Sequence, residues 1–374
     1  MKLLIPFGTR PEIIKLAPVV AALRAAGDEV TVVATGQHYD PALTEVFYDE
    51  LGIRPDIVCH ADGNRAERLG TLFTDAVRVV GERRPDAVLL LGDTHTVPAY
   101  CLASRNQAVP VVHLEAGLRS FNETSIEEVN RRVAAATASL HLAPTRLAHD
   151  FLRGEGIPEE RIAVVGNPVL DVLRLQKLRT TPVARRHGVV VTAHRATNVD
   201  NPERLEHLVR LVGDLAASVG PVTFPLHPRT RDALVRHGSL DRLAGPYVRL
   251  TDPLPYHDMI RHVARAKVVV TDSGGLQEEA AWLGVPVVVL RRSTPRWEGI
   301  HAGIAVLTGM DAPRAIKAAL ELTADDAQRW AAASPCPYGD GHTARHVVDI
   351  LHAPATAGLL RFDEPDFVDR EPPS

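Results

Sequence analysis

The chain has 374 residues, too many for one ordinary hydrophobic core, so we expect two domains of about 150 to 200 residues each. Hydrophobic residues make up 45% of the sequence, charged residues 24%, and the formal net charge is −4. This balance is typical of a globular enzyme and indicates neither a nucleic-acid nor a membrane-surface partner. The apolar runs are too short for a secretory leader or a membrane span, which predicts a cytoplasmic location.

Short apolar runs rich in valine, isoleucine and leucine recur along the chain without alternating with polar residues. This pattern is typical of strands buried on both faces of a parallel sheet. The runs are KLLIPF (2–7), EVTVVAT (29–35), DAVLLLG (86–92), PVVHL (110–114), RIAVVG (161–166), GVVVTA (188–193), KVVVTDS (267–273) and VPVVVLR (285–291). Helical patterns lie between them, as in residues 12–27, where Gly27 is expected to end the helix. The alternation predicts an α/β fold with two doubly wound, Rossmann-like parallel sheets.

The strand and helix units fall into two sets along the chain. They predict an N-terminal domain over residues 1–168 and a C-terminal domain over residues 185–350. A basic connector, RLQKLRTTPVARRHG (174–188), lies between the sets, and residues 351–374 are expected to form a loose, acidic tail. Two domains of this kind predict a cleft between them that holds a nucleotide-sized ligand.

Polar residues follow five of the predicted strands at the point where each strand ends. In open α/β sheets ligands bind outside the carboxyl ends of the strands, so these positions are candidate site residues. They are Arg10, Asp93, Glu115, His194 and Ser273. Asp93 or Ser273 alone could be a helix N-cap, and His194 a loop histidine. Five such residues, drawn from both halves of the chain, favour a shared site.

The segment TDSGGLQEEAAWLG (271–284) is the clearest single motif. Ser273, Gly274 and Gly275 form a turn that opens onto a helix, which offers backbone N–H groups to an anion such as phosphate. Glu279, one turn into that helix, could accept hydrogen bonds from ribose hydroxyls. The alternative for this motif alone is a generic glycine turn before a solvated acidic helix.

Several cofactor and metal signatures do not occur in the sequence. No GxGxxG follows the first strand and no GxxxxGK[ST] is present, so neither a nicotinamide cofactor nor a P-loop is expected. The 17 histidines show no HExxH spacing, and the three cysteines show no CxxC spacing. We therefore expect no metal site, no disulfide framework and no cofactor.

Together these motifs resemble the non-hydrolysing UDP-N-acetylglucosamine 2-epimerases. The resemblance covers nearly the whole chain, in order, over FGTRPEIIKLAPV, TGQH, LGDT, HLEAGLRS, EEVNRR, PLHPRTR, TDSGGLQEEA and YGDG. It implies a two-domain fold of the glycosyltransferase-B type, no redox cofactor, and a homodimer that interconverts UDP-GlcNAc and UDP-ManNAc. Hydrolysing relatives carry an HxGGE-like motif where this chain reads HLEAG, which argues against hydrolysis.

The resemblance also implies roles for single residues. Catalytic groups are expected at Asp93, Glu115, Glu127 and His194. The diphosphate is expected at Arg10, Ser273, Gly274 and Gly275, the ribose at Glu279, and the sugar at Lys15, Arg131, Arg296 and Glu298. Glu123 and Glu128 are expected to be surface charges.

The implied chemistry requires acidic side chains around a hexose ring. Loss of UDP from C1 creates oxocarbenium-like charge, which acidifies the C2 proton and yields 2-acetamidoglucal. Inversion at C2 then needs proton removal on one face and proton delivery on the other. A carboxylate cluster such as Asp93, Glu115 and Glu127 lets one group stay protonated while another acts as base.

Some positions depart from the family pattern. Where the family has HRREN, this chain has HRATN, with Ala196 and Thr197. Where the family has RDxTERPE, this chain has RRSTPRWE, with Arg292, Pro295 and Trp297. Where the family has GQHRE, this chain has GQHYD, with Tyr39 and Asp40. Met259 lies where an aromatic residue is expected to pack on uracil.

These departures leave regulation and substrate open. In bacterial members a second UDP-GlcNAc activates the enzyme. Its contacts are kept at Gln37, Arg195 and His227 but altered at Asp40 and Thr197, so the usual allosteric activation is not expected. The alternatives are an epimerase for a related UDP-sugar in polysaccharide or secondary-metabolite biosynthesis, a glycosyltransferase of the same fold, and a hydrolytic epimerase.

Overall fold

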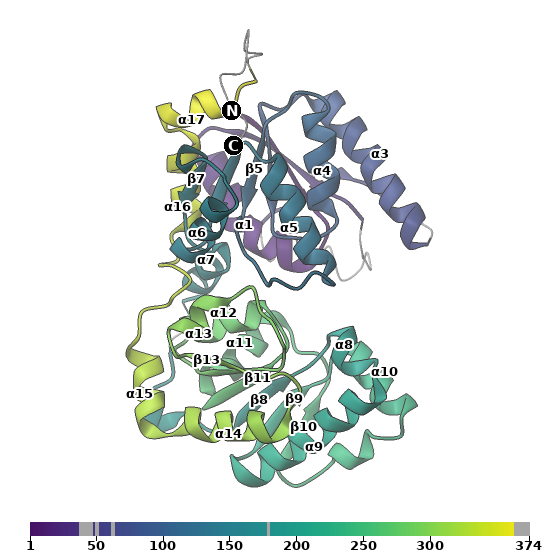
Figure 1. The fold of residues 1–374 in the computed structure, drawn as a ribbon, viewed down its shortest axis with the longest axis vertical. Coiled ribbons are helices and arrows are strands. Elements are labelled where there is room, and N and C mark those ends of the chain that lie inside the picture. The colour runs from purple at the N-terminus through teal and green to yellow at the C-terminus, as the bar shows by residue number, and fades with distance from the viewer. Residues whose placement is uncertain (37–47, 49–51, 61–63, 178–179, 363–374) are drawn as a thin grey trace, which may run out of the picture. The chain divides into compact units, whose positions relative to one another are not determined.

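The computed structural model describes residues 1–36, 48, 52–60, 64–177 and 180–362, which form two compact α/β units (Figure 1). The first unit comprises Met1–Gly117, Glu123–Val165 and the chain from Thr343 onward. The second comprises Leu118–Asn122 and Gly166–His342. The chain therefore returns to the first unit after His342. The acidic tail residues 363–374 lie outside the described part of the chain.

The described strands of the first unit form one parallel sheet of seven strands, in the order β3-β2-β1-β4-β5-β6-β7. They are β1 (Lys2–Phe7), β2 (Glu29–Ala34), β3 (Ile57–Val58), β4 (Ala87–Leu91), β5 (Val111–Leu114), β6 (Leu140–Ala143) and β7 (Ile162–Val164). The chain builds outward from β1 to β3 on one side and from β4 to β7 on the other. This change of direction puts a topological switch point between β1 and β4, where the loops after the two strands diverge.

Helices cover both faces of this sheet. They are α1 (Arg10–Ala25), α3 (Arg65–Arg83), α4 (Thr96–Arg105), α5 (Ile126–Thr137), α6 (Arg146–Gly154), α16 (Thr343–Leu351) and α17 (Pro354–Leu359). A core that includes Val79, Tyr100 and Ala134 joins α3, α4 and α5 to one face of the sheet. Helix α16 packs against α1, so the returning segment completes the first unit.

The described strands of the second unit form a parallel sheet of six strands, in the order β10-β9-β8-β11-β12-β13. They are β8 (Val189–Thr192), β9 (Val222–Pro225), β10 (Val248–Thr251), β11 (Val268–Thr271), β12 (Val287–Val289) and β13 (Ala305–Leu307). The helices are α7 (Pro168–Leu175), α8 (Ala196–Val199), α9 (Pro202–Ser218), α10 (Pro228–Arg236), α11 (Tyr256–Arg265), α12 (Gly275–Trp282), α13 (Trp297–His301), α14 (Ala312–Thr323) and α15 (Asp325–Ala333). The switch point of this sheet lies between β8 and β11.

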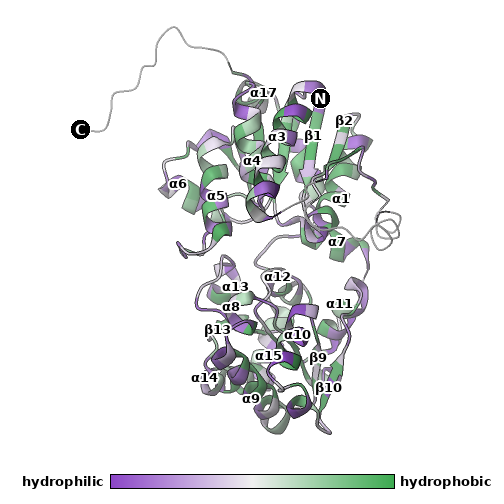
Figure 2. Ribbon diagram, turned by 90° about the vertical axis from the view of Figure 1, so that its right-hand side faces the viewer, coloured by the Kyte–Doolittle hydropathy of each residue, from purple (hydrophilic) through white to green (hydrophobic). Residues whose placement is uncertain are grey.

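Consecutive strand residues face two different cores, which is why the runs are apolar at every position. In β8, Val189 and Val191 join a core with α9, α10 and α14, whereas Val190 joins the opposite core with α7, α11 and α12. Figure 2 shows comparable hydrophobic strands in the first unit, at β1 and β2. The doubly buried parallel strands predicted from the sequence are confirmed.

All eight apolar runs form strands, but the pattern does not identify every strand. It leaves out β3, β6, β9, β10 and β13. β6 reads LHLA and β10 reads VRLT, so a polar residue interrupts each run. The predicted end of the first helix is confirmed, because α1 stops at Ala25 and Gly27 follows with a φ of +90°.

Two glycines with positive φ allow backbone strain to be separated from steric overlap. A Cβ on Gly117 (φ +82°) would lie 2.2 Å from the carbonyl oxygen of Ala148, whereas a Cβ on Gly27 (φ +90°) would meet nothing within 4 Å. We expect Gly27→Ala to lower the free energy of unfolding by about 1 kcal/mol, the cost of the backbone conformation alone. We expect Gly117→Ala to cost at least about 3 kcal/mol, because overlap adds to strain. Urea unfolding of both variants measures the difference, and equal losses would contradict the geometry.

Candidate active site

Glu115 lies directly after β5, in the first unit, in a strained backbone conformation. Its φ is +63°, which is uncommon for a residue with a side chain, and only 4% of its surface is exposed. The ammonium of Lys15, on α1, lies 2.6 Å from the carboxylate. Gly92 lies beside it, since a Cβ there would come within 3.6 Å of Oε2. Strained residues of this kind concentrate at functional sites, so the predicted site residue has an independent structural mark.

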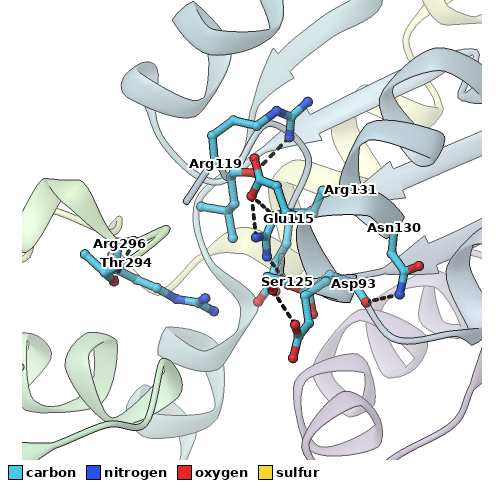
Figure 3. A network of polar contacts seen from close by, with 12 residues as sticks. Asp93, Glu115, Arg119, Ser125, Asn130, Arg131, Thr294 and Arg296 are labelled. Carbon is cyan, nitrogen blue, oxygen red and sulfur yellow. Dashed lines mark hydrogen bonds and ion pairs between the residues drawn. The ribbon is translucent and has the colours of Figure 1, made fainter. Parts of the chain in front are cut away.

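Asp93 lies after β4 and is held through both its side chain and its backbone. Its carboxylate pairs with Arg131 of α5, and its carbonyl oxygen accepts a hydrogen bond from Asn130 Nδ2 at 2.8 Å. Figure 3 shows Asp93, Glu115 and Arg131 next to one another, with Asn130 bonded to Asp93. The structure thus brings together three residues that the sequence assigned to a shared site.

The prediction that Glu128 is a surface charge is wrong. Only 1% of Glu128 is exposed, and its Oε2 accepts hydrogen bonds from Arg131 at 2.6 Å and 3.2 Å. Glu128 and Arg131 are three residues apart on α5 and therefore share one helix face. A buried carboxylate is stable only with such a partner, so Glu128 fixes the guanidinium that contacts Asp93. Glu123 is exposed, as predicted.

Glu127 lies in the first turn of α5, next to Glu128. Its carboxylate accepts a hydrogen bond from the hydroxyl of Ser125, the N-cap residue of this helix, at 2.5 Å. A negative charge in a first turn is favoured by the helix dipole. Glu127 is half-buried, which leaves part of its surface open to a ligand.

Glu12, which the sequence did not mark, connects the two strand ends of the first switch point. Its carboxylate accepts hydrogen bonds from Gly8 N–H at 3.0 Å, from the Thr9 hydroxyl at 2.8 Å and from the Thr94 hydroxyl at 2.8 Å. Burial raises the pKa of Glu12 to about 7, an effect larger than that of the three donors, which lower it. Glu12 thereby ties the turn before Arg10, which is the exposed first residue of α1, to the turn that carries Asp93.

His194 lies after β8, at the switch point of the second sheet, and contacts Asp272. Its Nδ1 is 3.2 Å from the carboxylate of Asp272, which follows the neighbouring strand β11 and is fully buried. The His194 side chain is 40% exposed. The ring is therefore held on one side and open to solvent on the other.

The predicted anion-binding turn lies next to this pair, at the start of α12. Ser273 N–H donates to Thr271 Oγ1 at 2.9 Å, and Ser273 Oγ accepts a long hydrogen bond of 3.4 Å from Leu276 N–H. Ser273 thus forms a weak local cap in addition to any ligand contact. Gly274 makes room for a side chain, because a Cβ there would lie 3.1 Å from Nη1 of Arg296. A Cβ on Gly275 would meet nothing within 4 Å.

The remaining predicted residues of the second unit lie around α12. Arg296 forms a buried ion pair with Glu278, with Nε 2.9 Å from Oε1. Glu298, two residues later, is also buried. Glu279 is buried beside Tyr256, whose pKa is raised by burial and then by the charge of Glu279.

Tyr256 provides an aromatic ring close to Met259, which lies at the position where an aromatic residue is expected. It lies one helical turn before Met259 on α11, and both pack against the same core of the second unit. Trp297, another departure from the family pattern, donates its indole N–H to the carbonyl oxygen of Arg119 at 3.0 Å.

Two of the three residues predicted for a second nucleotide site contact the His194 pair. The ring of His227 lies 5.4 Å from that of His194, and Arg195 Nε donates to the Asp272 carbonyl oxygen at 3.0 Å. His227 Nδ1 accepts from Arg229 N–H at 3.2 Å and caps α10. The third, Gln37, lies outside the described residues, as do Tyr39 and Asp40.

Within the described ranges, no group of three or more His, Cys, Asp or Glu side chains could hold a metal ion. Across the same residues, none of the helices combines the length and the hydropathy that a membrane span requires.

The fold and these side chains define a class of protein: a parallel α/β protein with charge-compensated carboxylates at the end of one sheet and a glycine turn beside a histidine at the end of another. The family model for UDP-N-acetylglucosamine 2-epimerase matches residues 21–352. The chain belongs to the UDP-N-acetylglucosamine 2-epimerase family, and the resemblance in its motifs is confirmed.

Relatives with two different names match with the same identity and coverage. The UDP-N-acetylglucosamine 2-epimerase of Methanocaldococcus jannaschii is 34% identical over 366 residues, which cover 94% of this chain and 99% of the relative. The UDP-2,3-diacetamido-2,3-dideoxy-D-glucuronate 2-epimerase of Pseudomonas aeruginosa shows the same identity and coverage.

Solved structures agree with the fold. The M. jannaschii enzyme in complex with UDP-GlcNAc and UDP matches with a TM-score of 0.84 and 34% identity, over 94% of this chain and 99% of that one. The enzyme of Neisseria meningitidis bound to UDP-GlcNAc also matches with a TM-score of 0.84, at 31% identity over 94% and 99% of the two chains.

The buried Glu12 predicts a dependence of stability on pH. Its pKa is about 7 in the folded chain against an ordinary 4.5, so its contribution is complete below about pH 4.5 and is lost as the pH rises through 7. Relative to Glu12→Gln, which stays neutral, the wild type should lose about 3 kcal/mol of unfolding free energy between pH 4.5 and 8. Urea unfolding across this range measures it. Glu29→Gln, at an exposed residue of β2, is the control and should follow the wild type. A constant difference between the wild type and Glu12→Gln would contradict the assignment.

Proposed function

We propose that the protein is a UDP-N-acetylglucosamine 2-epimerase that interconverts UDP-GlcNAc and UDP-ManNAc by anti-elimination of UDP and its re-addition to 2-acetamidoglucal. Family membership supports this proposal, and so do the relatives that carry that name or were solved with UDP-GlcNAc. The observation that carries it is the pair of carboxylates at the ends of β4 and β5, Asp93 and Glu115, each held against a cation.

The proposed reaction removes and returns a proton at C2 while the C1–O bond to UDP breaks and re-forms. Asp93, Glu115 and Glu127 are proposed as the acid, the base and the stabiliser of the oxocarbenium-like charge, in an order left open. Lys15 and Arg131 compensate two of these carboxylates and are proposed to line the sugar site. Fixed charges of this kind need no reorganisation when the ring becomes positive.

The nucleotide is proposed to bind through the polar groups that follow strands and begin helices. Arg10, His194, Ser273, Gly274 and Gly275 are the proposed diphosphate contacts, Glu279 is the proposed ribose contact, and Arg296 and Glu298 are further sugar contacts. The imidazole of His194 and the N–H groups at the start of α12 match the negative charge of a departing diphosphate.

The sugar has two candidates, because relatives named for two UDP-sugars match with the same identity and coverage. UDP-GlcNAc is the proposed substrate, and UDP-2,3-diacetamido-2,3-dideoxy-D-glucuronate is the competing one. The homodimer and the cytoplasmic location stay predictions, and so does the lack of activation by a second UDP-GlcNAc.

Solvent labelling tests the proposed reaction. In deuterium oxide, the purified protein should convert UDP-GlcNAc to the C2 epimer and place deuterium at C2 in both sugars, because the proton is exchanged in each direction. Mass spectrometry and proton NMR measure the label. Recovery of both sugars without label would rule the mechanism out, and stoichiometric release of UDP would point to hydrolysis. The diacetamido sugar in a parallel reaction decides between the two substrates.

Amide variants test the proposed proton carriers. Glu115→Gln and Glu127→Gln should each lower kcat by about 10²- to 10⁴-fold, the range expected when a group that transfers a proton is lost. Glu123→Gln, at an exposed residue between them, is the matched control and should keep the wild-type rate. Steady-state kinetics measure the change. Retention of most epimerase activity in Glu115→Gln and Glu127→Gln would contradict their role as proton carriers. Transfer of the sugar to an acceptor that neither substitution affects would favour a glycosyltransferase, which needs no acidic cluster around the sugar.

A further inference from the structure

Asp272 is a fully buried carboxylate that receives several hydrogen bonds from the end of β8. His194 N–H donates to both of its oxygens at 3.1 Å, and Arg195 N–H donates to Oδ2 at 3.0 Å. Asn198 Nδ2 donates to Oδ2 at 3.0 Å and also to the carbonyl oxygen of Leu290 at 3.1 Å. The ring nitrogen Nδ1 of His194 completes the set at 3.2 Å from Oδ1.

These contacts keep Asp272 ionised despite its burial. Burial opposes ionisation and is the largest single effect, but the hydrogen bonds and charge of His194, with those of Arg195 N–H and Asn198, together outweigh it. The pKa of Asp272 therefore lies below its usual value. A carboxylate accepts hydrogen bonds and does not donate them, so Nδ1 of His194 must carry the hydrogen that is shared with it.

Other charged groups also face the His194 ring. The ring of His227, the N-cap residue of α10, lies 5.4 Å away, and Arg229 N–H occupies its Nδ1. The pKa of His227 is lowered, first by burial and then by the charges of His194 and Arg229. Arg195 adds a positive charge close by. Asp272 is thus a negative group beside the positive groups around His194, and the carboxylate of Asp200 lies 3.6 Å from Nε of Arg229.

We propose that Asp272 is a positioning residue of the epimerase reaction, which acts by holding Nδ1–H of His194 so that Nε2 faces the departing diphosphate. This inference rests on the proposed function. When the C1–O bond breaks, its electron pair stays on the terminal phosphate oxygen of UDP. The Nε2–H of the imidazolium donates a hydrogen bond to that oxygen, and no proton needs to be transferred. The carboxylate of Asp272 stabilises the imidazolium and fixes the orientation of its ring, as in other His–Asp pairs.

Binding of UDP to the full chain tests this assignment without any turnover. Asp272→Asn removes the charge, and titration calorimetry at pH 6.5 should show UDP binding weakened by roughly 10- to 100-fold, the range of one hydrogen bond to a charged group. Asn198→Ala is the matched control, because it removes one donor to the same carboxylate and keeps the charge. It should weaken UDP binding by less than about threefold.

One further measurement separates positioning from a purely structural role. In a His194→Gln background, Asp272→Asn should weaken UDP binding little further, because it acts through the imidazole that this background lacks. If Asp272→Asn and Asn198→Ala weaken UDP binding equally, or Asp272→Asn costs the same in both backgrounds, the proposal is overturned.

If Asp272→Asn fails to fold, a measurement on the wild-type protein still tests the proposal. Nitrogen NMR of wild-type protein labelled with ¹⁵N-histidine should then show the His194 hydrogen on Nδ1, and a neutral ring that carries it on Nε2 would overturn the proposal. The failure of the proposed function is separable from that of this inference. If the variants change UDP binding as predicted but no deuterium enters C2, the epimerase reaction alone is rejected. If the product is labelled but Asp272→Asn binds UDP as the wild type does, the role of Asp272 alone is rejected.

Discussion

The burial of parallel strands on both faces is the constraint from which the rest of the structure follows. A strand such as β8 sends alternate valines into two opposite cores, so it has no face on which a polar side chain could lie. The proposed site residues therefore lie at the strand ends, although His113 and His141 are buried within β5 and β6, and in a parallel sheet all carboxyl ends share one edge. At β1 and β4, and again at β8 and β11, the chain also changes direction, so the loops diverge and leave these ends accessible.

Buried carboxylates at these ends connect neighbouring loops. Glu12 joins the loops after β1 and β4, Asp272 joins those after β11 and β8, and Glu128 orients the arginine that contacts Asp93. Asp272 and Glu128 would be unstable alone, because removing the partner of a buried charge costs several kcal/mol, on the order of 3 to 5. Each therefore requires its donors in fixed places. The same hydrogen bonds that stabilise the carboxylate consequently position the residues next to it.

The sequence predicted strand-end residues well and their buried partners poorly. Runs such as GVVVTA identify a strand and the polar residue that follows it, so His194 and Glu115 could be found from the chain alone. Asp272 lies inside the motif TDSGGLQEEAAWLG, but its role depends on the register between β8 and β11, in which Thr192 pairs with Thr271, 79 residues later. Glu128 differs, because its three-residue spacing from Arg131 is local and could have signalled the buried pair. The prediction of a surface charge at Glu128 leaves this spacing out of account.

The strained backbone of Glu115 fits the kind of chemistry proposed for this site. A residue with positive φ persists only where its surroundings hold it. Here the Lys15 ammonium holds the side chain, and the N–H groups of Gly92 and Ala116 donate to the carbonyl oxygens of Leu114 and Leu142 on either side of it. In a reversible elimination the hexose ring gains positive charge and loses it again within one turnover. A carboxylate whose position is already fixed stabilises that charge in both directions without moving, whereas a mobile one would have to be reordered each time. The strain at Glu115 is therefore consistent with a group that acts in the forward and the reverse reaction from one position.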